Sequence, residues 1–252
     1  MRIIAIINQK GGVGKTTTAV NLSASLAVAE KKVLLVDLDP QGNATVGFGV
    51  DITPTEASIY EALVLGKVLH NIVVDTRLEY LQILPSDERL YGAELELVGL
   101  VSRETRLKDA LETLSAERYD FIILDCPPSL GLLTINALTV ADSLLIPLPA
   151  EYLPMRGLAK LHATINLVTQ ELNTSLKIEG VLLTLYQPQF AHTKEVETEI
   201  RKYYSPYLYD TKIRQCIKLS EAHSFGQPAI LYDIISNGAQ DYLRLAGELL
   251  NA

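Results

Sequence analysis

The chain has 252 residues, of which 48% are hydrophobic and 21% are charged, and its formal net charge is -8. A chain of this size and composition buries one large core, so we expect a single domain over residues 1–252. The acidic balance argues against a protein built mainly to grip nucleic acid, which needs a local surplus of lysine and arginine. The two cysteines, Cys126 and Cys216, suit neither a metal-ligand pair nor a disulfide framework, and the amino terminus lacks a signal-peptide pattern. We therefore expect a reduced protein of the cytoplasm.

The sequence predicts strands and helices that alternate along the chain. An apolar run rich in isoleucine over residues 2–8 predicts a strand buried on both faces, and helical spacing begins at Lys15 after a glycine-rich turn. Further strands are expected within residues 33–39, 121–129, 143–150 and 178–186, and helices within residues 103–116, 156–172, 194–204 and 240–250. The pattern is weakest over residues 53–79. The alternation predicts an α/β fold with a doubly wound, mostly parallel sheet, helices on both faces and ligands at the carboxyl ends of the strands.

The turn after the first strand reads QKGGVGKTTT and predicts a phosphate-binding loop, although Gln9 stands where the usual G-x-x-x-x-G-K-T pattern has its first glycine. Glycines let backbone N–H groups approach phosphate oxygens at the positive end of the following helix. Lys15 stands where a P-loop lysine meets the β- and γ-phosphates of a nucleotide, and the Thr16 hydroxyl is placed for Mg²⁺. A glycine turn that merely closes a strand is the alternative, but the position between a buried strand and a helix is the one that the motif requires. The loop residues expected to contact the nucleotide are Gly11, Gly12, Val13, Gly14, Lys15, Thr16 and Thr17.

Three aspartates follow apolar runs and are candidates for metal binding and catalysis. Asp125 ends the run FIILD, and the prolines after it stop the strand, which is the Walker B pattern of a magnesium partner. Asp37 and Asp39 end the run VLLVDLD, where residues two apart point to the same face of an extended chain. Asp39 lies in the loop beyond the strand, so we expect it to orient the attacking water. Structural roles for Asp39 and Asp125 are the alternatives.

Taken together, these segments resemble one known family. The stretches QKGGVGKTT, VDLDPQGNAT and LDCPPSLG are similar to those of the deviant Walker A ATPases of the ParA/Soj chromosome and plasmid partitioning family, and the similarity runs over nearly the whole chain. The later segment KLSEAHSFGQPAILYD also looks like that family. The resemblance implies a fold of the P-loop NTPase type, ATP and Mg²⁺ as cofactors, weak ATP hydrolysis that a partner stimulates, and a homodimer that forms face to face with ATP.

The resemblance also implies roles for individual residues. Lys10 would be the signature lysine that reaches across the dimer to the phosphates held by the other subunit, as a cationic finger. A solvated loop lysine is the alternative. The two aspartate-bearing loops would be the switch regions that respond to the γ-phosphate. Glu151 matches a family position near the nucleotide at the dimer interface. The adenine pocket is expected at Gln215 and Cys216, but family members commonly have Pro-Arg-Asn there, so the base contacts depart from the family pattern.

By the same resemblance, the dimer would bind DNA without sequence preference through basic residues of the carboxyl-terminal half. Within residues 194–218 the chain has six basic and four acidic side chains. The residues expected to contact DNA are Arg201, Lys202, Arg214 and Lys218. Ordinary solvated charges are the alternative. The other implied partner is a ParB/Spo0J-type centromere-binding protein, and the implied location is the cytoplasm in association with the nucleoid.

Three other interpretations stay open. A MinD-like positioning ATPase would need a basic amphipathic helix at the carboxyl terminus, whereas AQDYLRLAGELLNA contains no lysine, so we expect no stable membrane association. An electron carrier similar to the nitrogenase iron protein would hold a cluster with cysteines of both subunits, and the places of Cys126 and Cys216 do not suit this. The third interpretation is a nucleotide-gated dimerisation module whose hydrolysis is negligible.

Overall fold

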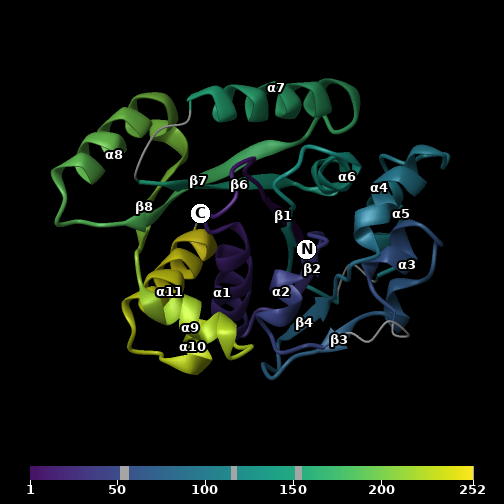
Figure 1. Ribbon diagram of the computed structural model, residues 1–252, viewed down its shortest axis with the longest axis horizontal. Helices are drawn as coiled ribbons and strands as arrows, with labels where there is room; N and C mark the ends of the chain where they lie inside the picture. The colour runs from purple at the N-terminus through teal and green to yellow at the C-terminus, as the bar shows by residue number, and fades with distance from the viewer. Residues whose placement is uncertain (52–56, 115–117, 151–154, 252) are drawn as a thin grey trace.

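A computed structural model describes residues 1–51, 57–114, 118–150 and 155–251. Within these residues one sheet crosses the molecule in the order β3-β4-β2-β5-β1-β6-β7-β8 (Figure 1). The strands of this sheet are β1 (Arg2–Ile6), β2 (Val33–Asp37), β3 (Val74–Asp75), β4 (Leu81–Leu84), β5 (Phe121–Asp125), β6 (Ser143–Pro149), β7 (Lys177–Tyr186) and β8 (Leu208–Arg214). Among them β3 runs antiparallel to its neighbour β4, and every other pairing is parallel. The doubly wound, mostly parallel sheet is therefore confirmed.

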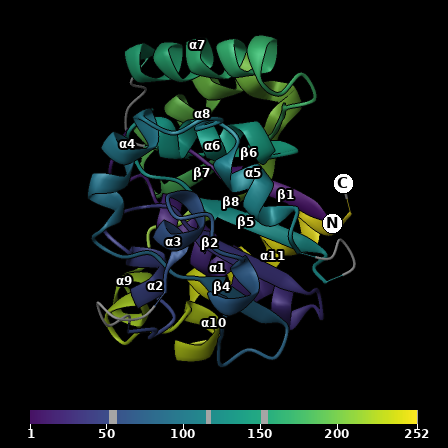
Figure 2. The ribbon, with the colours of Figure 1, turned by 90° about the vertical axis from the view of Figure 1, so that its right-hand side faces the viewer.

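Helices cover both faces of this sheet (Figure 2). The helices in the described residues are α1 (Lys15–Val28), α2 (Asn43–Val46), α3 (Ile59–Leu63), α4 (Leu90–Val98), α5 (Arg106–Leu111), α6 (Leu132–Val140), α7 (Met155–Glu171), α8 (Ala191–Tyr204), α9 (Ile217–Ser224), α10 (Ala229–Tyr232) and α11 (Asn237–Leu250), with short 3-10 turns η1 (Leu69–Asn71) and η2 (Ser205–Tyr207). Successive side chains of β1 alternate between two cores. Ile4 and Ile6 pack in the core that contains α1 and α11, whereas Ile3, Ala5 and Ile7 pack in the core on the other face. Because both faces are covered, the strand reads as a continuous apolar run.

The order of the strands fixes where a ligand can bind. β1 lies between β5 and β6 in the sheet. The chain passes from β1 to β2 on one side of it and from β5 over to β6 on the other, so the direction of winding reverses there. A crevice forms at such a reversal, outside the carboxyl ends of the strands, and this is where open α/β sheets bind ligands. The glycine-rich loop departs from the carboxyl end of β1. The sequence motif and the topology therefore point to the same place.

The predicted strands are confirmed, but several end earlier than expected. β1 stops at Ile6, β2 at Asp37 and β5 at Asp125, because the residues that follow leave the sheet to form the loops of the candidate site. The predicted helix over residues 103–116 is shorter, since α5 begins at Arg106 and ends at Leu111. The sequence does not predict strands β3, β4 and β8 or helices α2, α3, α4, α6, α9 and α10. They complete the sheet and cover its faces.

Helix α11 packs on the core rather than standing apart from it. Its Tyr242, Leu245 and Leu249 are buried and join the core that contains α1. Glu248 accepts hydrogen bonds from the backbone N–H groups of Asp210 and Thr211 in β8, at 2.7 and 3.0 Å. No helix in the described part of the chain is long and apolar enough to cross a membrane.

Candidate nucleotide site

The glycine-rich loop adopts a backbone that its glycines permit. Gly12 and Gly14 have φ angles of 72° and 88°, in the left-handed region that residues with a Cβ rarely adopt, and α1 begins directly after Gly14. The loop is anchored to β7, because the Thr184 hydroxyl donates to the Val13 carbonyl oxygen at 2.8 Å. Its N–H groups therefore lie at the positive end of a 14-residue helix, where a phosphate would be stabilised.

A cavity of about 340 Å³ opens at this loop. Its walls come from the loop, from the segment after β2, from the segment after β5 and from α9: Gly11, Gly12, Gly14, Lys15, Thr16, Thr17, Asp39, Gln41, Asn43, Pro128 and His223. Lys15 is buried, and its Nζ donates to the carbonyl oxygen of Lys10 at 3.3 Å. Burial lowers the pKa of Lys15, while the charges of Asp125 and Asp39 raise it. The structure thus brings together the loop lysine and two of the predicted aspartates.

Asp125 is completely buried at the carboxyl end of β5. Neither of its carboxylate oxygens has a hydrogen-bond partner in the described residues. Burial raises the pKa of Asp125 well above its usual range and the nearby Asp37 adds to this, whereas Thr16 and Lys15 lower it. A buried carboxylate without a partner is costly, and a divalent cation beside it would remove that cost. A threonine hydroxyl and one carboxylate also suit Mg²⁺, which prefers oxygen ligands and keeps several waters.

The two aspartates of the other strand occupy different environments. Asp37 is buried, lies opposite Asp125 in the β2–β5 register and accepts hydrogen bonds from the backbone N–H and the hydroxyl of Thr45, both at 2.8 Å. Burial raises the pKa of Asp37 to about 6, against the hydrogen bonds that lower it. Asp39 instead lines the nucleotide cavity, and its Oδ1 accepts from the N–H of Gln41 at 3.0 Å. Of the two, Asp39 is the one that faces the place of a nucleotide.

A second cavity, of about 440 Å³, adjoins the first at Gly14 and Thr17, which line both. Its further walls are Thr184, Leu185, Ile213, Arg214, Gln215, Cys216, Ile217, Leu219, Ser220 and Tyr242. Gln215 is exposed and Cys216 is half-buried at the amino-terminal end of α9. The predicted base-pocket residues therefore lie within one cavity that continues from the phosphate loop. Its size and its mixture of apolar and polar walls are those of a small-molecule site.

Asn43 and His223 are among the residues of the first cavity that the sequence does not predict as site residues. Asn43 begins α2, and its side-chain amide donates to Gln41 at 3.0 Å. His223 lies in the last turn of α9, and burial lowers its pKa. His223 belongs to the segment that was recognised as family-like, but nothing in its spacing places it at the phosphate loop. The fold brings it there from more than 200 positions away in the chain.

Comparison with known proteins identifies the family. The sequence profile of a family described as an AAA domain matches residues 1–178. The chromosome partitioning protein ParA of Myxococcus xanthus is 52% identical to this chain over 249 residues, covering 99% of this chain and 88% of that protein. The sporulation initiation inhibitor protein Soj of Bacillus subtilis is 52% identical over 248 residues, covering 98% of each. The chain belongs to the ParA/Soj family.

A solved structure with the same fold as this ParA/Soj protein contains a nucleotide analogue. A cobyrinic acid a,c-diamide synthase of Mycobacterium smegmatis, crystallised with an ATP analogue and magnesium, is 36% identical with a TM-score of 0.87 and covers 100% of this chain and 95% of that one. The fold is thus shared with a protein crystallised with an ATP analogue and magnesium.

Two residues, Lys10 and Glu151, are predicted to act across a dimer of this ParA/Soj protein. Lys10 is exposed at the edge of the loop, and its backbone N–H donates to the Asn8 side chain at 3.0 Å. An exposed lysine beside the phosphate cavity has the freedom to reach a second molecule. Glu151 lies outside the described residues.

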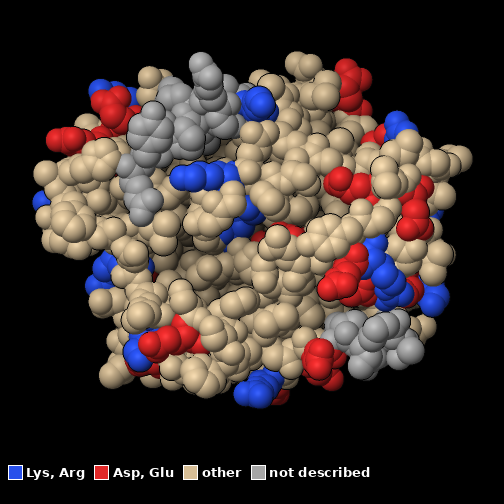
Figure 3. All heavy atoms as spheres, viewed as in Figure 1, with Lys and Arg blue, Asp and Glu red and all other residues tan. Residues whose placement is uncertain are grey.

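Each predicted DNA-binding residue of this ParA/Soj protein forms an ion pair with an acidic side chain. Arg201 pairs with Glu197 at 3.0 Å, Lys218 with Glu221 at 2.8 Å, Arg214 with Asp241 at 2.7 Å and Lys202 with Glu199. Arg214 is the most restrained, because it makes a two-pronged contact with Asp241, whose side chain is only 1% exposed. On the face drawn in Figure 3 basic and acidic side chains are interspersed.

Proposed function

We propose that this ParA/Soj protein is an ATPase of DNA segregation. With ATP and Mg²⁺ it forms a homodimer, the dimer binds DNA without sequence preference, and hydrolysis, stimulated by a ParB-type partner, releases the DNA. The observation that carries the proposal is a cavity lined by both the P-loop and Asp39, with the buried Asp125 close enough to raise the pKa of Lys15 in that loop. The 52% identity to a chromosome partitioning protein over nearly the whole chain supports the biological role.

The residues of the site divide the work of phosphoryl transfer. The N–H groups of the loop and the buried Lys15 would bind the β- and γ-phosphates. Thr16 and Asp125 would hold Mg²⁺, which when bound supplies positive charge to the phosphate oxygens. Asp39 would orient the attacking water, and Lys10 of a second copy would add a cationic finger, a device that contributes about 10³ to 10⁵ in rate in comparable systems. A site completed by a second copy couples the nucleotide to the oligomeric state.

The other interpretations have weaker support. The apolar face of α11 is buried in the core, which leaves it unsuited to lie on a membrane surface. Cys126 is also fully buried in the core, where it cannot reach a cluster shared between two subunits. The hydrolysis-free dimerisation module differs from the proposal in one respect alone, the role of Asp39.

The proposal is tested by measuring the affinity for a labelled non-specific DNA duplex with ATP, ADP and no nucleotide, at one fixed salt concentration. We expect binding with ATP at least about tenfold tighter than with ADP, because dimerisation doubles the number of phosphate contacts. Asp39→Ala should strengthen ATP-dependent binding by stopping hydrolysis. Lys10→Ala, the monomeric control, should bind nucleotide but show no ATP-dependent increase.

Two outcomes would contradict the proposal, and a third would favour another interpretation. Equal DNA binding in all three nucleotide states would remove the nucleotide switch, even if light scattering detects an ATP dimer. Hydrolysis at the parental rate by Asp39→Ala would show that another group orients the water. Hydrolysis that is undetectable in the parental protein, even with DNA and a ParB-type partner present, would favour the dimerisation module.

A further inference from the structure

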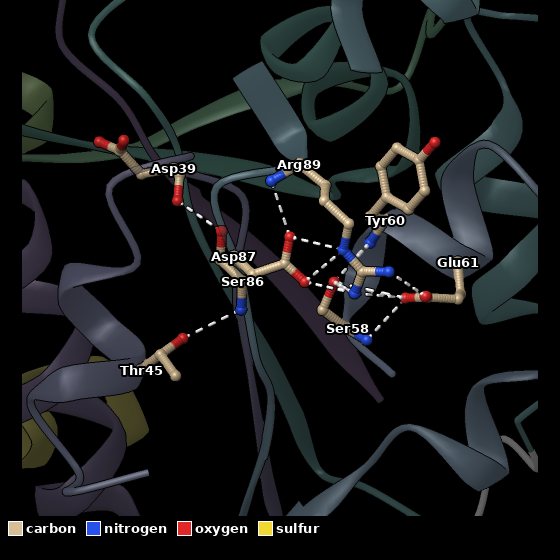
Figure 4. A network of polar contacts seen from close by, with 8 residues as sticks. All are labelled: Asp39, Thr45, Ser58, Tyr60, Glu61, Ser86, Asp87 and Arg89. Carbon is tan, nitrogen blue, oxygen red and sulfur yellow. Dashed lines mark hydrogen bonds and ion pairs between the residues drawn. The ribbon is translucent and has the colours of Figure 1, made fainter. Parts of the chain in front are cut away.

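A closed ring of hydrogen bonds surrounds the backbone of Asp39. Figure 4 shows the two bonds of this ring that Ser86 makes, to Asp39 and to Thr45. The N–H of Asp39 donates to Asp37 at 3.1 Å, and the Thr45 hydroxyl donates to the other oxygen of Asp37 at 2.8 Å. The Thr45 hydroxyl in turn accepts from the N–H of Ser86 at 3.0 Å. The ring closes because the Ser86 hydroxyl donates to the carbonyl oxygen of Asp39 at 2.6 Å. The Asp39 residue is thus held from both sides of its backbone.

The members of the ring are shielded from water. Asp37 is fully buried, Thr45 and Ser86 are each 3% exposed and Asp39 is 8% exposed. Buried hydrogen bonds of this kind cannot be replaced by water without moving the chain. Figure 4 shows the carboxylate of Asp39 pointing away from Ser86 and Thr45, while its carbonyl oxygen points toward the Ser86 hydroxyl. The ring therefore fixes the backbone and leaves the carboxylate directed at the nucleotide cavity.

The ring is also tied to a second element. Ser86 follows β4, and three residues later Arg89 contacts both Asp87, through its Nε at 3.0 Å, and Glu61 of α3, through its Nη2 at 3.2 Å. Glu61 accepts from the N–H of Ser58 at 2.8 Å in a capping box that begins α3. Ser86 therefore lies on a loop whose position is set by charged contacts to a neighbouring helix.

We propose that Thr45 is a positioning residue for ATP hydrolysis. Its hydroxyl links Asp37 to Ser86, and through them it holds Asp39 in the orientation that the reaction needs. Thr45 does not itself line the nucleotide cavity at the glycine loop, so it acts through Asp39. The inference rests on the proposed role of Asp39. The Asp39 carboxylate then depends on the Thr45 hydroxyl, six residues further along the chain.

The test compares Thr45→Val, which keeps the shape of the side chain without the hydroxyl, with Thr45→Ser, which keeps the hydroxyl. We expect Thr45→Val to lower kcat about 10- to 100-fold with KM for ATP nearly unchanged, because a displaced catalytic group loses rate without losing substrate contacts. Thr45→Ser should restore most of kcat. Thr139→Val is the matched control, because it removes another buried threonine hydroxyl, which donates to Ile135 at 2.8 Å within α6. Release of labelled phosphate from ATP measures the rates.

The outcomes separate this inference from the proposed function. If Asp39→Ala is inactive while Thr45→Val turns over at the parental kcat, the positioning role is overturned and the proposed function stands. If Asp39→Ala is itself active, the assigned role of Asp39 fails, and the positioning role fails with it. If Thr45→Val does not fold, Ser86→Ala decides, since it removes the hydrogen bond to the Asp39 carbonyl from the other side of the ring. A parental kcat in Ser86→Ala then overturns the inference, and a kcat reduced with unchanged KM supports it.

Discussion

At the scale of single residues, Asp37 and Asp39 have similar positions in the sequence but different surroundings in the structure, which the sequence does not predict. The sequence locates both carboxylates at the end of a buried strand, and alternation in an extended chain predicts that they share a face. Their roles diverge because Thr45, eight positions after Asp37, supplies two donors to Asp37 alone. Contacts of that kind depend on how the loop folds, which strand periodicity does not describe. The phosphate loop was predictable because its glycines and lysine act through local geometry.

The raised pKa of Asp37 predicts a pH-dependent stability. The pKa of this carboxyl is about 6 in the folded protein against an ordinary value of 3.8. Between these two values the folded state holds a proton that the unfolded chain has released, so the free energy of unfolding should fall as pH rises. Asp37→Asn lacks this proton. The stability of the parental protein minus that of Asp37→Asn should therefore decrease as pH rises from about 4 to 6.

Urea denaturation across this pH range, without nucleotide or magnesium, measures the Asp37 effect. Subtracting the two stabilities removes the pH dependence of carboxyl groups that Asp37 does not influence. Asp125, whose pKa Asp37 raises, adds a decrease of the same sign. A difference that stays constant, or that grows with pH, would show that the Asp37 carboxyl is not held protonated by its burial.

At the scale of elements, the sequence predicted the central strands better than the edges of the sheet. β1, β2, β5, β6 and β7 are apolar runs, because helices cover both of their faces. β8 reads LYDTKIR and is partly exposed, so it lacks that signature. β3 has two residues and pairs antiparallel. Edge strands gain their conformation from a neighbouring strand, and this information is not in their own composition.

The ends of α2 and α9 meet at two glycines, and this contact predicts a sensitive position. Gly49 and Gly226 have φ angles of 66° and 62°, and a Cβ on Gly226 would lie 2.8 Å from the Cα of Gly49. A substitution there meets both backbone strain and a backbone clash. We expect Gly226→Ala to lower the free energy of unfolding by about 1 to 3 kcal/mol. The measurement is urea denaturation without nucleotide.

Gly247 provides the matched control for this glycine contact. It lies within α11, and a Cβ there would meet nothing within 4 Å. Gly247→Ala should leave stability unchanged or raise it by up to about 1 kcal/mol, because alanine favours a helix over glycine. A Gly226→Ala protein as stable as the parent would show that the two loops separate easily. Such a result would mean that the contact between Gly226, after α9, and Gly49, after α2, does not hold these two segments together.

At the scale of the whole molecule, charge decides how the proposed DNA contact can work. The chain is acidic overall, and its candidate DNA-binding side chains already have acidic neighbours. Exposed ion pairs of this kind are weak, so a phosphate can compete for the cation. One subunit offers few such cations, and a dimer doubles them. Neither composition nor periodicity predicts this arrangement, because it depends on which helices lie side by side and on a second copy.

Arg201 gives the sharpest test of this arrangement. Its side chain is 44% exposed on α8, and Arg201→Gln keeps a polar group beside Glu197 while removing the charge. In the ATP-bound dimer the residue occurs twice, so the slope of log affinity against log salt should become shallower by about 2. Lys108→Gln, at an exposed position of α5, is the matched control and should keep the parental slope. An unchanged slope in Arg201→Gln, with ATP-dependent dimerisation intact, would place the DNA contact on a different surface, because each lost phosphate contact must reduce the number of counterions released.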